Sequence, residues 1–213
     1  MSNPREKFNE LMIERLMNNL KKRGLNGHYC KSTDELVETA MQLVKDCKTV
    51  TSGGSMTLKE SGILDMLSSI PDIEFVNREN YSDPKEVEEV YRKAFSSDCY
   101  FMSTNAITED GILVNIDGRG NRVAALIYGP KRVVIIAGVN KITSTFDEAI
   151  LRARTIAAPI NSMRLNNNTP CVQTGVCANC LSPDCICDQF VITRKSMDPD
   201  RIHVILVDEE YGY

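Results

Sequence analysis

Residues 103–122 read STNAITEDGILVNIDGRGNR and are the part of the chain hardest to explain as ordinary packing. The apolar run at residues 112–114 lies between two turn sequences, at residues 109–111 and 117–121, so the stretch predicts a β-hairpin. Apolar segments flank the hairpin at residues 99–102 and 123–138, and both predict buried strands. The hairpin carries more glycine and acidic residues than a turn requires.

Two interpretations of this hairpin are open. Its turns could be solvated connections, because Gly, Asn and Asp dominate turns that bind nothing. Alternatively, its glycines bring backbone N–H groups close to a ligand, and its polar side chains contact that ligand at strand ends. The candidate ligand-binding residues on the second interpretation are Asn105, Glu109, Gly111, Asp117, Gly118, Gly120 and Asn121.

A second candidate site follows a short strand expected at residues 49–51. The sequence SGGSMT (residues 52–57) leads from that strand into a helix expected to run through Leu58, Ile63 and Leu67. A strand, a glycine turn and a helix together aim free N–H groups and the positive helix end at an anion. The sequence is neither a Walker loop nor GxGxxG, so tight packing is an equal alternative. The candidate anion ligands are Gly53, Gly54, Ser55 and Thr57.

Strands and helices alternate along the rest of the chain. Ser32 and Glu35 form a capping box that opens a helix, Asp83 and Pro84 open another, and residues 73–77 and 132–137 predict strands. This alternation predicts an α/β fold with a Rossmann-like, mostly parallel sheet, helices on both faces and an inserted antiparallel hairpin.

Polar residues follow the strand at residues 132–137. Ligands collect beyond the carboxyl ends of parallel strands, so Asn140 and Lys141 are candidates for the same pocket as the hairpin. The alternative is that Lys141 is a solvated loop lysine. On the ligand interpretation Glu109, Asp117, Asn121 and Lys141 converge on one cavity, and Glu109, Asp117 and Lys141 are the candidates for proton transfer.

The N-terminal residues carry a helical stripe of Phe8, Met12, Leu16 and Leu20 that ends before Gly24. We therefore expect an N-terminal helix at residues 1–23 and an α/β domain at residues 24–213. The helix would pack on the body of the domain or on a partner subunit, which leaves a homodimer open.

Charge and hydropathy limit which classes of partner and which cellular compartment we expect for this protein. The formal net charge is −4 and the longest basic block is Lys21-Lys22-Arg23, which argues against nucleic acid as a partner. Apolar runs such as residues 133–137 are too short to cross a bilayer, and the polar start MSNPREKFNE does not resemble a signal peptide. We expect a cytoplasmic protein without a membrane partner.

Five of the eight cysteines crowd into residues 171–187, spaced C-x5-C-x2-C-x4-C-x-C. In a reducing compartment such crowding indicates metal, so Cys171, Cys177, Cys180 and a later cysteine are candidate ligands for zinc or a 4Fe-4S cluster. A redox-active disulfide and simply buried thiols are the alternatives.

An ordered set of motifs resembles the LUD-domain (lactate utilisation) family over residues 24–213. The motifs are GGSMT (53–57), TNAITEDG (104–111), DGRGNRVAA (117–125), YGP (128–130), GVNKI (138–142) and AAPINSMRL (157–165). The resemblance implies the fold shared by ribose-5-phosphate isomerase and the CoA transferases. It also implies Cys187 as the usual fourth cysteine, with Cys185 standing where the family has an arginine.

The family is named for members that work with iron–sulfur proteins in oxidising lactate to pyruvate. The resemblance therefore implies a small anionic metabolite as ligand, an accessory role in the oxidation of lactate or a related organic acid, and iron–sulfur oxidoreductases as partners. Two alternatives remain: a metal or iron–sulfur electron-transfer or assembly partner, and a sugar-phosphate or CoA-ester enzyme of the same fold.

Overall fold

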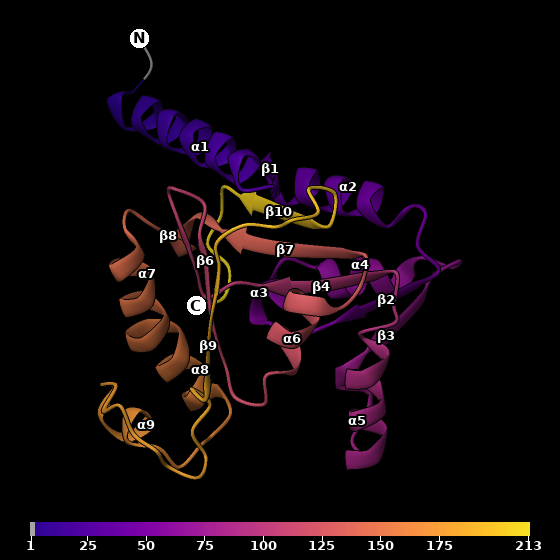
Figure 1. Ribbon diagram of the computed structural model, residues 1–213, viewed down its shortest axis with the longest axis vertical. Helices are drawn as coiled ribbons and strands as arrows, with labels where there is room; N and C mark the ends of the chain where they lie inside the picture. The colour runs from indigo at the N-terminus through magenta and orange to yellow at the C-terminus, as the bar shows by residue number, and fades with distance from the viewer. Residues whose placement is uncertain (1–2) are drawn as a thin grey trace.

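The structure is a computed structural model that describes residues 3–213 and contains two sheets (Figure 1). The larger sheet has six strands, all parallel. Their spatial order is β1 (Asn26–Cys30), β10 (Ile202–Val207), β7 (Arg132–Gly138), β4 (Cys99–Ser103), β2 (Thr49–Ser52) and β3 (Glu74–Asn77).

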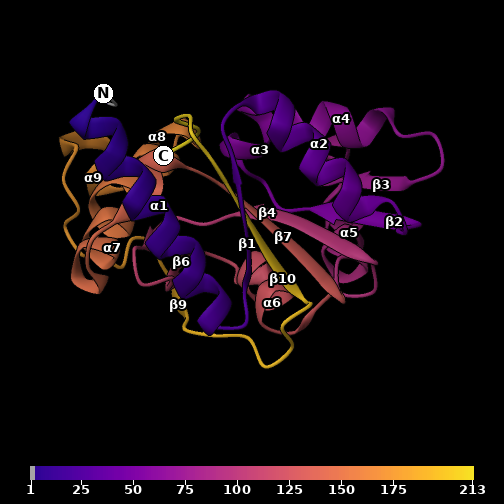
Figure 2. The same ribbon diagram turned by 90° about the horizontal axis from the view of Figure 1, so that it is seen from above.

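Helices cover both faces of this sheet because alternate residues of each strand point to opposite sides. Val134 and Ile136 of β7 join one buried cluster and Val133 and Ile135 join another. Figure 2 shows α2, α3 and α4 on one side of the sheet and α6 on the other. The predicted Rossmann-like architecture is confirmed, and its helices are α1 (Pro4–Lys22), α2 (Thr33–Val44), α3 (Met56–Glu60), α4 (Ile63–Ser69), α5 (Pro84–Lys93) and α6 (Asn121–Tyr128).

The smaller sheet contains the predicted hairpin. Its four strands are ordered β8 (Ile142–Thr143), β5 (Ala106–Thr108), β6 (Leu113–Asp117) and β9 (Gln189–Thr193). β5 and β6 are antiparallel, with Ala106 opposite Val114. A helical segment made of α7 (Phe146–Arg152), a π-helical turn (Ala153–Ala157) and α8 (Ala158–Arg164) packs on this sheet through small alanine side chains.

Two expectations about local structure are wrong. Residues 123–128 form helix α6 instead of continuing a buried strand, because Val123 and Leu126 are buried at helical spacing and Ile127 is exposed. The single helix expected through Leu58 and Leu67 is two helices, α3 and α4, since Gly62 adopts a left-handed conformation (φ +72°) between them.

The predicted N-caps are present, but the capping box is incomplete because Glu35 Oε2 accepts from the backbone N–H of Lys31 and not of Ser32. The Ser32 side chain accepts a hydrogen bond from the backbone N–H of Glu35, and Asp83 caps α5 in the same way. The remaining short elements are two 3-10 turns, Arg78–Asn80 and Val139–Lys141, and α9 (Pro170–Thr174). Within residues 3–213, no helix combines the length and apolarity needed to cross a bilayer.

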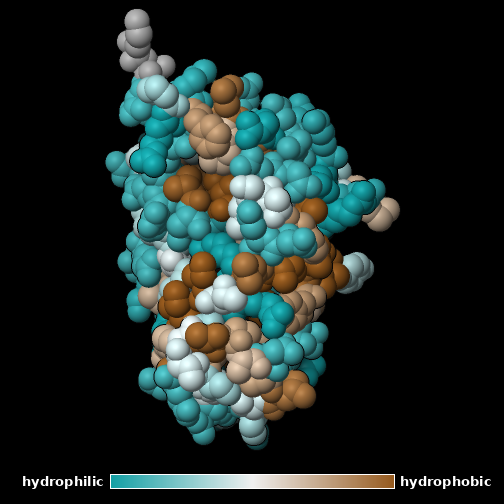
Figure 3. Space-filling view, turned by 90° about the vertical axis from the view of Figure 1, so that its left-hand side faces the viewer, coloured by the Kyte–Doolittle hydropathy of each residue, from teal (hydrophilic) through white to brown (hydrophobic). Residues whose placement is uncertain are grey.

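One side of the molecule carries exposed apolar residues. Leu151, Ile156, Ile160 and Met163 follow each other at intervals of five, four and three residues, which keeps them on one side of the α7–α8 segment. Figure 3 shows apolar surface on this side of the molecule. Exposed apolar surface of this kind is typical of interaction sites, and the homodimer stays a prediction.

Candidate functional site

A cavity of about 620 Å³ opens where several strands of the two sheets end. Ser103 ends β4, Gly54 follows β2, Lys141 follows β7 and Asp117 ends β6, and all of them line this cavity. The carboxyl ends of parallel strands meet here, which is where ligands collect in open α/β sheets. The structure also brings Ser55, Thr57, Asn105, Gly118 and Asn121 to this cavity, as the ligand interpretation expects.

Lys141 lies buried beside this cavity, with an exposed fraction of 2%. Its Nζ donates to Thr57 Oγ1 at 2.7 Å and to Ser103 Oγ at 2.9 Å, and none of the ion pairs within residues 3–213 includes it. The alternative of a solvated loop lysine is therefore wrong.

Burial is the main cause that lowers the pKa of Lys141, to about 7, because a desolvated ammonium ion is unfavourable. The nearby positive charges of Arg152 and Arg122 lower this pKa further, and the carboxylate of Glu60 acts in the opposite direction. The side chain is thus poised to gain or lose a proton near neutral pH.

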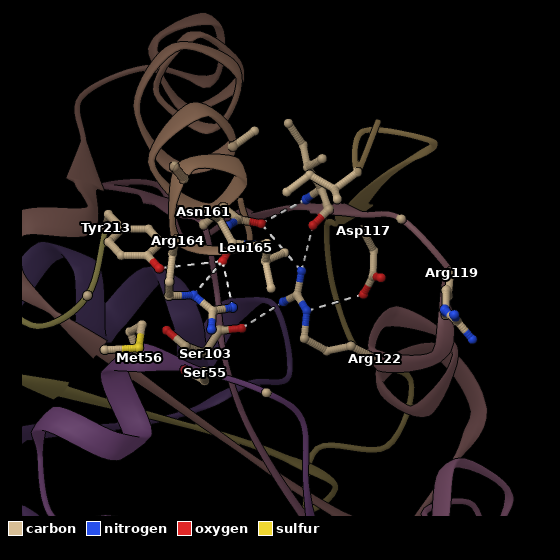
Figure 4. A pocket seen from close by; sticks show the side chains of 18 of the residues that line it. Ser55, Met56, Ser103, Asp117, Arg119, Arg122, Asn161, Arg164, Leu165 and Tyr213 are labelled. Carbon is tan, nitrogen blue, oxygen red and sulfur yellow. Dashed lines mark hydrogen bonds and ion pairs between the residues drawn. The ribbon is translucent and has the colours of Figure 1, made fainter. Parts of the chain in front are cut away.

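Arg122 is the central polar group of the cavity wall and was not singled out by the sequence. Its Nη1 donates to Ser103 O at 2.9 Å and to Asn115 Oδ1 at 2.7 Å. Its Nη2 donates to Ile116 O at 2.8 Å, and its Nε lies 3.2 Å from Asp117 Oδ2 (Figure 4). The guanidinium ties the hairpin to β4, and Asp117 has its counter-ion here. The sequence signal for this arginine is an Asn and an Asp on one short apolar strand, because buried polar side chains need a hydrogen-bond partner.

Arg164 enters the cavity from α8, close to Asn161 and Tyr213 (Figure 4). Its Nε and Nη2 both donate to Asn161 Oδ1, at 3.1 and 2.9 Å. This partner is neutral, and the ion pairs found within residues 3–213 do not include Arg164. Its exposed guanidinium can therefore accept an anion where the cavity meets solvent.

The first hairpin turn lies away from the cavity and anchors α1. Glu109 pairs with Arg15 at 2.6 Å, and its backbone carbonyl accepts from Asn19 Nδ2 at 3.0 Å. Gly111 has φ +86°, and a Cβ there would lie 3.1 Å from the backbone nitrogen of Leu20. The expected convergence of four polar residues therefore fails for Glu109, and neither Glu109 nor Gly111 lines the pocket.

Three other candidates have structural contacts outside the cavity lining. Gly53 is needed for packing, since a Cβ there would lie 2.6 Å from Tyr100 Oη. Gly120 adopts φ +81° at the start of α6. Asn140 donates from Nδ2 to Gly212 O at 3.3 Å. None of these three is among the cavity-lining residues of the described chain.

The glycine turn before α3 is only partly free. The Ser55 side chain caps the helix by accepting from the Leu58 N–H at 3.4 Å, and a Cβ added at Gly54 would meet nothing within 4 Å.

The LUD domain family model matches residues 13–207. The chain belongs to the LUD domain family. A solved DUF162 family protein from Deinococcus radiodurans is similar over 93% of this chain and 97% of its own length, with 12% identity and a TM-score of 0.52. The eIF2B delta subunit from Chaetomium thermophilum is similar over 68% of this chain and 56% of its own length, with 15% identity, and its TM-score of 0.34 is too low to bear on the fold. No functionally curated protein matches the sequence.

The cysteine-rich segment of this LUD domain surrounds a second cavity, of about 110 Å³. All five of its thiols line that cavity and are free, namely Cys171, Cys177, Cys180, Cys185 and Cys187. Within residues 3–213, however, no three His, Cys, Asp or Glu side chains come close enough to hold one metal ion. The expectation that these thiolates share a single zinc ion is therefore not supported by this geometry.

Proposed function

We propose that this LUD domain binds a small organic anion in the cavity between the two sheets. The observation that carries the proposal is Lys141, a buried amine without a carboxylate partner in the described chain, in a cavity that also contains the exposed guanidinium of Arg164. A buried cation is costly unless it is paired. A bound anion would supply the missing partner.

The cavity lining favours a ligand with one anionic group. Arg78, Arg119 and Arg164 line it, but so do Glu79, Asp184 and Asp188, so the cavity is not uniformly positive. A polyphosphate would meet repulsion from these carboxylates. A carboxylate with a neighbouring hydroxyl or carbonyl group suits the mixture of charges and hydroxyl donors. The volume is in the range of small-molecule sites.

The role in lactate or related organic-acid oxidation is part of this proposal, and iron–sulfur oxidoreductases are the proposed partners. Because of this proposed role, lactate, pyruvate and phosphate are the first ligands to test. A sugar-phosphate or CoA-ester enzyme is the alternative on the same fold, and the acidic side chains of the lining disfavour it.

Calorimetric titration and thermal unfolding test this proposal. We expect lactate or pyruvate to bind and to raise the melting temperature, because a ligand of the native state stabilises it by mass action. Arg164→Met should weaken binding roughly tenfold, the loss expected for one charged hydrogen-bonded contact. Arg92→Met is the matched control, since Arg92 lies exposed on α5. The proposal is wrong if none of the anions binds, or if both variants bind equally well.

A second candidate function concerns the cysteine cavity. Its five free thiols line one cavity, and cysteine thiolates are the ligands that hold iron–sulfur clusters. Anaerobic purification with absorption spectroscopy and metal analysis tests this. Cys180→Ser should lose bound iron and Cys185→Ser should retain it; a parent protein with neither iron nor zinc would leave only the thiol and disulfide interpretations.

A further inference from the structure

We propose that Lys141 forms an imine with the carbonyl carbon of a 2-oxo acid whose carboxylate is held by Arg164. The inference rests on the proposed anion site and names the class of its ligand. It also changes the role of the cavity from binding to covalent chemistry.

The surroundings of Nζ suit an amine that changes its protonation state. Its two hydrogen-bond partners, Thr57 Oγ1 and Ser103 Oγ, are hydroxyls at 2.7 and 2.9 Å. A hydroxyl can accept from an ammonium ion or donate to a neutral amine, whereas a carboxylate would hold the amine in its charged form. Both forms of Lys141 can therefore be satisfied without moving the side chain.

Two arginines held in place near Lys141, Arg152 and Arg122, disfavour the charged form of its amine. Arg152 donates from Nε to Asn140 O at 3.0 Å, and Arg122 is held by the hairpin, so neither guanidinium can readily turn away. Burial and these charges lower the pKa of Lys141 to about 7. A large fraction of the amine is then neutral and nucleophilic at neutral pH, which is how lysines are activated for carbonyl chemistry.

The reaction needs no oxidant or reductant. The nitrogen lone pair of Nζ forms a C–N bond with the carbonyl carbon, and the carbonyl oxygen becomes a hydroxyl group. That oxygen then leaves as water with the two amine hydrogens, giving a C=N bond. The hydroxyls of Thr57 and Ser103 lie within hydrogen-bond distance of Nζ and can carry these protons.

The charges of the cavity select the carbonyl compound. Arg164 offers a planar guanidinium that donates to the amide oxygen of Asn161 and forms no ion pair within the described residues. A guanidinium of this kind can hold a carboxylate through two hydrogen bonds. A ketone or aldehyde carrying a carboxylate therefore fits the pair Arg164 and Lys141 better than a neutral carbonyl compound does.

Reductive trapping tests the proposal. The full chain is incubated with pyruvate and cyanoborohydride near neutral pH, and labelled lysines are located by peptide mass spectrometry. We expect Lys141 to carry the carboxyethyl group roughly tenfold or more above Lys131, an exposed lysine outside the cavity lining. Labelling of Lys141 no greater than that of Lys131 overturns the proposal.

Variants and a second probe separate the imine from the anion site. Lys141→Arg keeps a positive charge, so it should lose the label and still be stabilised by pyruvate, and Arg164→Met should reduce labelling of Lys141. Acetone lacks a carboxylate, and equal labelling by acetone overturns the 2-oxo acid assignment. Stabilisation by pyruvate without labelling of the parent overturns the imine alone, whereas the absence of both overturns the anion site as well.

Discussion

Lys141 and Arg122 are neighbouring cations that the fold treats differently. Arg122 donates to backbone carbonyls and side-chain oxygens around its whole guanidinium, so its charge is compensated by the protein. Lys141 has two hydroxyl partners and a lowered pKa. Replacing Arg122 should therefore lower the stability of the protein. Replacing Lys141 should raise it, because a buried functional group is kept at a cost in stability.

For Lys141→Met we expect a gain of about 1 kcal/mol in the free energy of unfolding at or below neutral pH. The pKa of Lys141 is about 7 in the folded state against 10.5 as the ordinary value, so below pH 7 folding must bury the charge. As the pH rises above 7 only the unfolded chain keeps the proton, and the parent gains stability. Urea unfolding at about pH 6 and about pH 9 checks this; an equal gain at both would contradict it.

For Arg122→Lys we expect a loss of about 2–4 kcal/mol, because an ammonium ion cannot reproduce the forked hydrogen bonds and leaves buried acceptors unpaired. Arg119→Lys is the matched control. Arg119 lies three residues before Arg122, is exposed, and points away from Arg122 (Figure 4). Denaturant unfolding of both variants is the measurement, and equal stabilities would show that the network around Arg122 is not needed.

The sequence could assign Asp117, Asn121 and Lys141 to the cavity, because ligands bind beyond the carboxyl ends of strands and those ends can be located from the order of elements alone. It could not show that Lys141 is buried, since burial depends on the segment around Gly212, whose Cβ position would lie 3.5 Å from Nζ. Arg164 was missed for a related reason. An arginine at a helix end is usually solvated, and only the approach of α8 to the hairpin gives this one a site.

At the scale of elements, the hairpin has two turns with different tasks. The turn after β6 faces the cavity, and the turn after β5 holds α1 through Arg15, Asn19 and Arg23. Both turns combine glycine with acidic residues. The sequence therefore predicted the hairpin but could not assign its turns, because the difference lies in which distant helix each turn meets.

We expect Gly111→Ala to destabilise the protein by about 1–3 kcal/mol, since its positive φ is unfavourable with a Cβ and that Cβ would crowd the backbone of α1. Amide hydrogen exchange should show the loss of protection in α1 first. Gly54→Ala is the control for stability, because a Cβ there meets nothing within 4 Å. Unchanged protection in α1 would show that this turn does not hold the helix.

The alternation of strands and helices was sufficient to predict the larger sheet. The prediction failed for helix α6, because the apolar residues of the short segment VAALIY fit the periodicity of a strand as well as that of a helix. The left-handed Gly120 and the packing of Leu126 against the large sheet decide the outcome, and neither can be seen in the local pattern.

At the scale of the molecule, one buried cluster joins α1 to both sheets. Leu16 and Leu20 of α1 lie in the same cluster as Leu113 of the smaller sheet and Val204 of the larger one. The N-terminal helix thus belongs to the core that holds the cavity walls together. The geometry of the site depends on a helix that contributes no side chain to it.

Leu16→Ala should cost about 2–5 kcal/mol, because it leaves a cavity in a fully buried position. Leu11→Ala is the same change on the same helix at a residue that is 43% exposed, and we expect it to cost less than about 1 kcal/mol. Calorimetric unfolding should show one transition for the parent and for both variants, since the core is shared. A separate early transition in Leu16→Ala would show that the two sheets unfold independently.

The π-helical turn at Ala153–Ala157 has a consequence for how relatives are compared. Such a turn holds one residue more than an α-helical turn, and each residue of an α-helix advances it by about 100°. A chain lacking Thr155 would close into a continuous α-helix, and α8 would rotate so that Arg164 no longer reached the cavity. A one-residue gap at this point in a relative's sequence would therefore mark a protein that holds its ligand with a different set of side chains.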